Sequence, residues 1–266
     1  MCLTESETHR ADLCAVDSLS GAGTTLVEGI AFESSIDFDP GSQNIVFTDG
    51  EGDLALMSVE SGEVTPIGVA GTSPGFVAAG KIAAVTPDGG AVLVVDPVTG
   101  EVVRRIEVAG RGGIGPDEKI FGFDMGVSGE LYVELYLETD DGWLNSFVVV
   151  SPEGEVERLV PLGDLRVGSP DVDPSGERLA VTIDGVITVT DLELNPIVRL
   201  SRPDWVSTTP DWSPAGDLVV WLSNAVPEPV GPVAVVMRDA QAEFPQTVVV
   251  GSGPLPLHSV PVFPTW

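Results

Sequence analysis

The chain has 266 residues, of which 43% are hydrophobic, and its 12 Lys and Arg against 41 Asp and Glu give a formal net charge of -29. So acidic a surface repels phosphate backbones and argues against nucleic-acid binding. No run of about 18 apolar residues and no intact secretory leader is found, so we expect no membrane span. The 31 Gly and 22 Pro favour many short strands joined by turns, in one all-β domain over residues 1–266.

A short motif recurs along the chain, at the first strand (strand A) of each repeat. It carries an aromatic or apolar anchor residue, which is commonly followed by a Pro-Gly turn. The anchors are Phe38 in SSIDFDPG, Phe76 in TSPGFVAAG, Phe123 in IFGFDMG, Val172 in SPDVDPSG, Trp212 in TPDWSPAG and Phe263 in SVPVFPTW. Their spacing of about 40 to 50 residues is typical of four-stranded propeller blades.

Three further strands, B, C and D, follow each anchor in chain order. The predicted strands are 44–48, 53–59 and 64–69; 81–86, 91–96 and 102–108; 130–138, 146–151 and 156–162; 178–183, 186–191 and 196–201; and 218–223, 233–239 and 246–251. Each is a short, β-rich apolar run bounded by turn residues.

The sixth repeat is split between the two ends of the chain. HSVPVF, residues 258–263, supplies its strand A, and 1–5, 11–17 and 24–28 supply strands B, C and D. Closure of this kind leaves no free inner edge and ties down both termini. The sequence therefore predicts a six-bladed β-propeller of four-stranded antiparallel blades, with blade six divided between 1–30 and 257–266.

The best copy of the motif resembles the Pro-x-Trp-Ser-Pro-x-Gly repeat of TolB-type propellers, at Pro210, Trp212, Ser213, Pro214 and Gly216. Looser copies extend the resemblance along essentially the whole chain, although the third repeat, FDMGVSGE, lacks both prolines. TolB-type propellers are mostly extracytoplasmic and mostly bind proteins or peptides. The resemblance thus implies an extracytoplasmic location, periplasmic, cell-surface or secreted, and a protein or peptide partner.

The two cysteines, Cys2 and Cys14, fall on predicted strands B and C of blade six. If those strands pair about a turn near Thr8, the two residues stand opposite each other, within reach of a disulfide. A disulfide would indicate an oxidising compartment. Two free thiols, or a lipid-bearing Cys2, are the alternatives.

Long connections are all expected at one end of the blades, where the B–C and D–A loops lie. These loops are residues 110–119, 139–143, 163–169, 202–208, 224–232 and 251–258. Functional residues concentrate on loops, and Arg and Trp are favoured at binding hot spots. The candidate partner-binding residues are His9, Arg111, Trp143, Arg166, Arg202, Trp205 and His258. Alternatively, the tryptophans cap blade ends and the arginines pair with neighbouring acids.

Acidic residues flank the anchors on strand A, which lines the channel of a propeller. They are Asp37, Asp39, Asp124, Asp171, Asp173 and Asp211. Carboxylates that approach one another there would have raised pKa values or bind a hard cation such as calcium. Aspartate beside a Pro-Gly turn also caps that turn through its own backbone, and no DxDxDG loop is present.

Catalytic motifs are scarce: the chain has two histidines and no GxSxG, HExxH, CxxC or phosphate-binding loop. We read GRGGIG, residues 110–115, as a flexible connection. The favoured hypothesis is a non-catalytic, monomeric propeller without a cofactor that binds a protein or peptide at its loop-rich face. A calcium-dependent hydrolase or lactonase on the same fold, and a structural module of a larger surface or sensor protein, are the alternatives.

Overall fold

The computed structural model describes residues 10–16, 23–31, 35–39, 41, 43–139, 142–163, 167–201, 205–213, 215–225 and 233–239. Between Arg105 and Ile106 the chain divides into two compact units. Within the described ranges, no helix has the length and apolar character needed to cross a bilayer.

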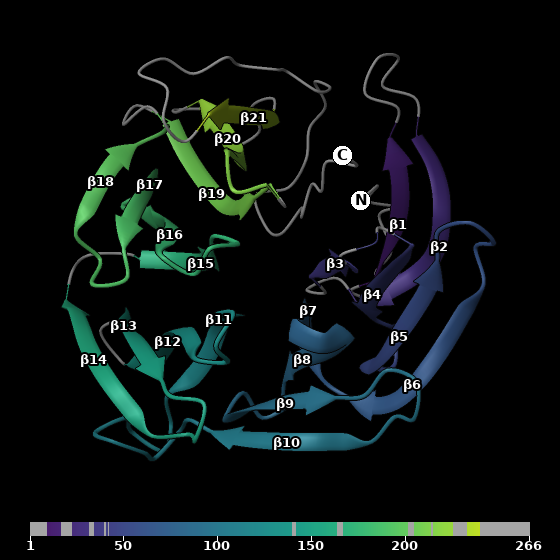
Figure 1. The fold of residues 1–266 in the computed structure, drawn as a ribbon, viewed down its shortest axis with the longest axis horizontal. Helices are drawn as coiled ribbons and strands as arrows, with labels where there is room; N and C mark the ends of the chain where they lie inside the picture. Colours follow the sequence, from purple (N-terminus) through teal and green to yellow (C-terminus); the bar gives the residue numbers. More distant parts are fainter. Residues whose placement is uncertain are drawn as a thin grey trace. The chain divides into compact units, whose positions relative to one another are not determined.

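The first unit is built from antiparallel sheets whose strands lie in sequence order (Figure 1). Sheet one contains β3 (Ile36–Phe38), β4 (Asn44–Thr48), β5 (Asp53–Ser58) and β6 (Val64–Ala70). Sheet two contains β7 (Thr72–Val77), β8 (Lys81–Val85), β9 (Ala91–Val95) and β10 (Val102–Glu107), with a short 3-10 turn at Ala78–Gly80. A further pair joins β1 (Arg10–Val16) to β2 (Gly23–Ala31).

The second unit repeats the same order of strands. Sheet three contains β11 (Lys119–Met125), β12 (Leu131–Thr139), β13 (Gly142–Val150) and β14 (Val156–Gly163). Sheet four contains β15 (Val167–Val172), β16 (Arg178–Ile183), β17 (Val186–Asp191) and β18 (Pro196–Arg199). The described part of sheet five contains β19 (Trp205–Trp212), β20 (Leu218–Ala225) and β21 (Val233–Asp239).

These strands confirm the predicted antiparallel repeats between residues 44 and 239, to within a few residues at each end. The pairing of β1 with β2 also confirms that the strands predicted at 11–17 and 24–28 are neighbours. The predicted strands at 1–5, 246–251 and 258–263 lie outside the described residues, so the split sixth blade stays a prediction.

Within each unit the hydrophobic core lies between successive sheets. Between sheets three and four it contains Tyr132, Phe147, Val167 and Leu179. Between sheets four and five, Trp212 packs with residues of both sheets. Sheets one and four are thus buried on both faces, which explains why their central strands are nearly continuous apolar runs.

Strand A of sheets two, four and five carries a bulge at the same place. Three non-glycine residues there, Ser73, Ser169 and Thr209, have φ of 49 to 50°, and each precedes a proline. The strand register shifts at each of these points. Left-handed φ is costly for residues with a Cβ, so the bulge is a strained feature that the surrounding packing maintains.

The register corrects the alignment of the third repeat. Met125 pairs with Leu131 as Phe38 pairs with Ile45, whereas Phe123 pairs two residues further along, with Val133. The structural anchor of sheet three is therefore Met125 and not Phe123.

Candidate partner-binding surface

Aspartates on the inner strands connect one sheet to the next. Each sits immediately before an anchor, and one carboxylate oxygen accepts a hydrogen bond from the anchor N–H of the following sheet. The bonds run from Phe76 N to Asp37 (2.6 Å), from Val172 N to Asp124 (2.7 Å) and from Trp212 N to Asp171 (2.5 Å). Hydrogen bonds from backbone N–H groups to carboxylates are among the stronger ones in proteins, so this position holds adjacent sheets in register.

The aspartates after the anchors cap turns, as the alternative interpretation had it. Asp39 accepts bonds from Gln43 N (2.6 Å) and from both nitrogens of Asn44.

Asp211, which precedes the anchor Trp212, lies on the inner strand opposite Val220. Within the described part of the chain, no three His, Cys, Asp or Glu residues lie close enough to hold a metal ion. The calcium site thus stays a prediction without a supporting cluster.

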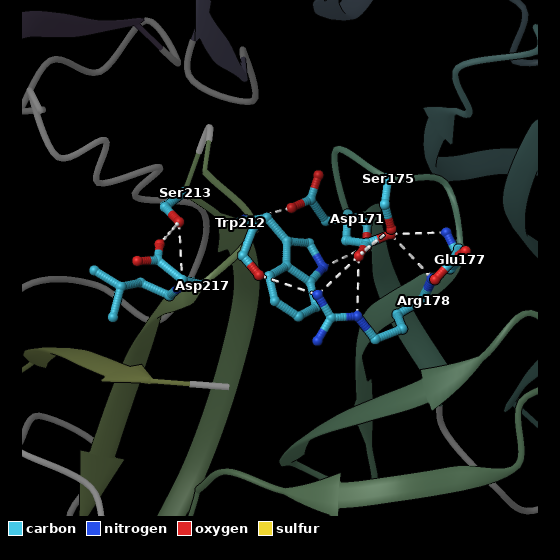
Figure 2. A network of polar contacts seen from close by, with 10 residues as sticks. Asp171, Ser175, Glu177, Arg178, Trp212, Ser213 and Asp217 are labelled. Carbon is cyan, nitrogen blue, oxygen red and sulfur yellow. Dashed lines mark hydrogen bonds and ion pairs between the residues drawn. The ribbon is translucent and has the colours of Figure 1, made fainter. Parts of the chain in front are cut away.

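Arg178 and Trp212 form the centre of a polar network between sheets four and five (Figure 2). The Arg178 guanidinium lies 4.6 Å from the centre of the Trp212 ring, pairs with Asp173 and donates to the carbonyl of Gly216. Burial alone would raise the pKa of Asp173, yet its hydrogen bonds, above all those from Ser175 and Arg178, together lower it. The best copy of the repeat motif therefore serves to join sheets.

Asp124 and Asp171 approach each other, as predicted for strand A carboxylates. Burial raises the pKa of Asp124 to about 6, although hydrogen bonds from Val172 N and Met125 N and the contact with Asp171 act in the opposite direction. The interaction of the two carboxyl groups thus lowers the pKa of Asp124, whereas the sequence predicts that their approach would raise it. Loss of hydration explains the shift, since the contact with the second carboxyl group does not raise it.

A second buried acid lies on the same face of sheet three and was not singled out in the sequence. Glu134 of β12 is 6% exposed and pairs in register with Gly122, and its Oε2 accepts a bond from Ser169 N at 3.0 Å. Burial raises its pKa to about 7, and the bond from Ser169 lowers it in part. A Cβ at Gly168 would come within 3.2 Å of the carboxyl group. Glycine on β11 and β15 thus leaves room for this side chain.

Strands β12 and β13 form an extended hairpin, nine residues on each side. The structure corrects the long B–C connection expected at 139–143, because pairing continues to Thr139 and Gly142. Exposed apolar side chains gather at this end of sheet three. Phe121, in the bulge of β11, is 62% exposed and meets Tyr136 edge to face with ring centres 5.9 Å apart. Leu144, 53% exposed, pairs with Leu137 and therefore lies on the other face of the hairpin from Tyr136, which pairs with Asn145. We call Phe121 and Tyr136, which are in contact, the hairpin patch.

Only part of the predicted partner-binding set is described. Trp143 lies in β13 with its backbone opposite Glu138, at the hairpin end, and Trp205 begins β19 opposite Ala225. The backbone of Cys14 pairs with that of Thr25 in β1 and β2. His9, Arg166, Arg202, His258 and Cys2 lie outside the described residues.

Arg111 is exposed, in the loop between β10 and β11 for which the sequence predicts a flexible connection. Ile114 is buried in the loop and its N–H bonds to the carbonyl of Arg111 at 2.7 Å. Gly112 has φ of 52°, and a Cβ there would lie 2.4 Å from Val156. The loop therefore packs on β14, the outer strand of sheet three, and Arg111 lies apart from the aromatic pair on β11 and β12.

The opposite end of sheet three carries a pocket of about 320 Å³ that sequence reasoning missed. It is lined by Ser128, Glu130, Tyr132, Val149, Pro152, Glu157, Arg158, Leu192 and Glu193. Burial raises the pKa of Tyr132 to about 12, and the Glu130 carboxylate adds to the effect. Arg158 crosses to the Leu192 carbonyl at 2.5 Å and to Glu193, so the pocket spans the turns of two sheets.

The successive antiparallel sheets, with core between them in each unit, are consistent with a β-propeller fold. The structure is similar to that of a putative TolB from Agrobacterium tumefaciens, with a TM-score of 0.62 and 15% identity over 90% of this chain and 88% of that one. It is also similar to Kuenenia stuttgartiensis hydrazine synthase, with a TM-score of 0.58 and 14% identity over 86% of this chain and 70% of that one. No family model and no curated protein sequence matches the chain. The likeness establishes a TolB-like propeller fold.

Proposed function

We propose that this chain is a non-catalytic, extracytoplasmic propeller that binds a protein or peptide at the loop-rich end of its sheets. The observation that carries the proposal is the hairpin patch. Two aromatic side chains, Phe121 and Tyr136, are in contact at the end of the long β12–β13 hairpin, and Phe121 is 62% exposed. Aromatic residues supply much contact area at low entropic cost, and exposed apolar groups on a rim of polar residues mark interaction sites.

The inner-strand carboxylates support a binding role over a catalytic one. Asp37, Asp124 and Asp171 are engaged by backbone N–H groups of the next sheet, and Asp173 is engaged by Arg178. These groups hold the scaffold together. The resemblance to TolB-type propellers supports an extracytoplasmic location and a protein partner.

We also propose that the propeller has six blades and acts as a single, monomeric domain. In this arrangement strands from 1–5 and 258–263 complete the blade that contains β1 and β2. Closure of the ring in this way ties down both ends of the chain and leaves no incomplete blade.

Site-specific photo-crosslinking tests the binding proposal. A photoreactive amino acid is placed at Leu144 or, as a control, at Val98, which is 91% exposed in the turn between β9 and β10. We expect a discrete crosslinked partner from position 144 and none from 98. Phe121→Ala should abolish this capture without lowering the melting temperature, whereas Val98→Ala should change neither. Equal capture from both positions, or capture that survives Phe121→Ala, contradicts the proposal.

A further inference from the structure

Glu134 is a buried acid, and only one of its two carboxyl oxygens accepts a hydrogen bond from a described residue. Its Oε2 accepts the bond from Ser169 N, and its Oε1 accepts none from any residue that the structure describes. A carboxyl group with over nine-tenths of its surface buried and a free oxygen is costly to ionise. Inner-strand carboxylates elsewhere accept bonds on both oxygens, as Asp37 does from Phe38 N and Phe76 N.

The position of Glu134 is unlike its equivalents in the neighbouring sheets. By register, Thr48 of sheet one and Thr182 of sheet four occupy the same place in strand B. Thr48 donates its hydroxyl to the Gly71 carbonyl. Two other sheets thus have an uncharged side chain at this place, so the repeat itself does not require a carboxyl group there.

Glu134 lies directly beside the hairpin patch. Tyr136 is two residues further along β12 and so on the same face, and Phe121 adjoins Gly122, the register partner of Glu134. Two charged residues of β11 lie on the same face as Glu134. Lys119 pairs with Tyr136, and Asp124 pairs with Tyr132, two residues before Glu134 in β12. The pKa of Glu134 responds to burial and to the Ser169 bond.

We propose that Glu134 and the Phe121–Tyr136 pair form the recognition site for a basic side chain, lysine or arginine, of the protein or peptide partner. The inference rests on the proposed function and specifies its chemistry. Aromatic faces attract cations, and a carboxylate in a poorly hydrated site attracts them more strongly than one in water. Gly122 and Gly168 leave the carboxyl group bordered by backbone. The net charge of -29 favours the approach of a basic partner.

The test uses N-acetylated trilysine amide as the probe, titrated into the full chain at low salt and followed by calorimetry and by the NMR signals of Tyr136. The same peptide with acetylated side-chain amines is the uncharged control. We expect saturable binding of the charged peptide only, at least tenfold weaker in Glu134→Gln and in Phe121→Ala. Glu153→Gln makes the same charge change at an exposed turn of the same sheet and should leave the affinity unchanged.

A second measurement follows the affinity as the pH is changed. Binding of a cation favours ionised Glu134, so the affinity of the wild-type chain should rise between about pH 6 and pH 8, and Glu134→Gln should lose that rise. Full binding by Glu134→Gln with loss in Phe121→Ala overturns the inference and leaves the proposed function standing. Equal binding by all variants in this assay overturns the inference, while failure of the crosslinking at Leu144 overturns the proposed function.

Discussion

Replacing Glu134 with glutamine should change the pH dependence of stability in a defined direction. The pKa of Glu134 in the folded chain is about 7, against an ordinary value of 4.5. Because the folded state holds the proton more tightly, this group favours folding below pH 4.5, and that contribution is lost as the pH rises through 7. With about 1.4 kcal/mol for each unit, the free energy of unfolding falls by about 3 kcal/mol across this window.

Glutamine keeps the shape of the side chain and an oxygen to accept the Ser169 N–H, but it does not ionise. We therefore expect Glu134→Gln and the wild type to have similar stability near pH 4, with the variant more stable by about 3 kcal/mol near pH 8. Urea unfolding followed by tryptophan fluorescence at a series of pH values measures this difference, and Glu153→Gln is the matched control. A difference that is constant with pH, or that grows toward acid, refutes the reasoning.

Three further predictions concern the scaffold and the metal. Asp173→Asn should lower the free energy of unfolding by about 2 to 4 kcal/mol at neutral pH, because it leaves Arg178 without its buried charged partner. The variant should also lose part of the decrease in stability that the wild type shows below pH 4, and urea unfolding measures both effects. Gly112→Ala should destabilise the chain by about 1 to 3 kcal/mol because its Cβ meets Val156 at positive φ; a melting temperature equal to that of wild type contradicts this. Calcium titration by calorimetry tests the hydrolase alternative: the binding proposal predicts no heat and no melting shift on chelation, and a stoichiometric site would contradict it.

Local turn chemistry made the strands predictable. In TPDWSPAG, the turn between β19 and β20 forms as expected, with Gly216 at φ of 70° and Ser213 N bonded to the Leu218 carbonyl. Short apolar runs between such turns leave few alternatives for strand placement. The same local reasoning identified aspartates as turn caps, which the bonds to Asp39 bear out.

The bulges and the site depend on pairing between strands and were therefore harder to predict. The aromatic side chain of Phe123 suggested the wrong anchor, whereas the aspartate before each anchor was the better marker, at Asp37, Asp124 and Asp171. Phe121 is exposed only because the register shifts beside it. Glu134 did leave a signal in the sequence: it is the single acid inside the apolar core of ELYVELYLE.

The central claim is that a partner binds at the hairpin end of sheet three. A partner is first isolated by its binding to the wild-type protein. Amide hydrogen exchange of the chain, compared without and with this partner, then measures where the partner binds. We predict that the partner slows exchange at residues 119–122 and 136–139, and that Phe121→Ala removes the effect. Slower exchange confined to the opposite turns, at 126–130 and 151–155, with none at the hairpin end, would contradict the account.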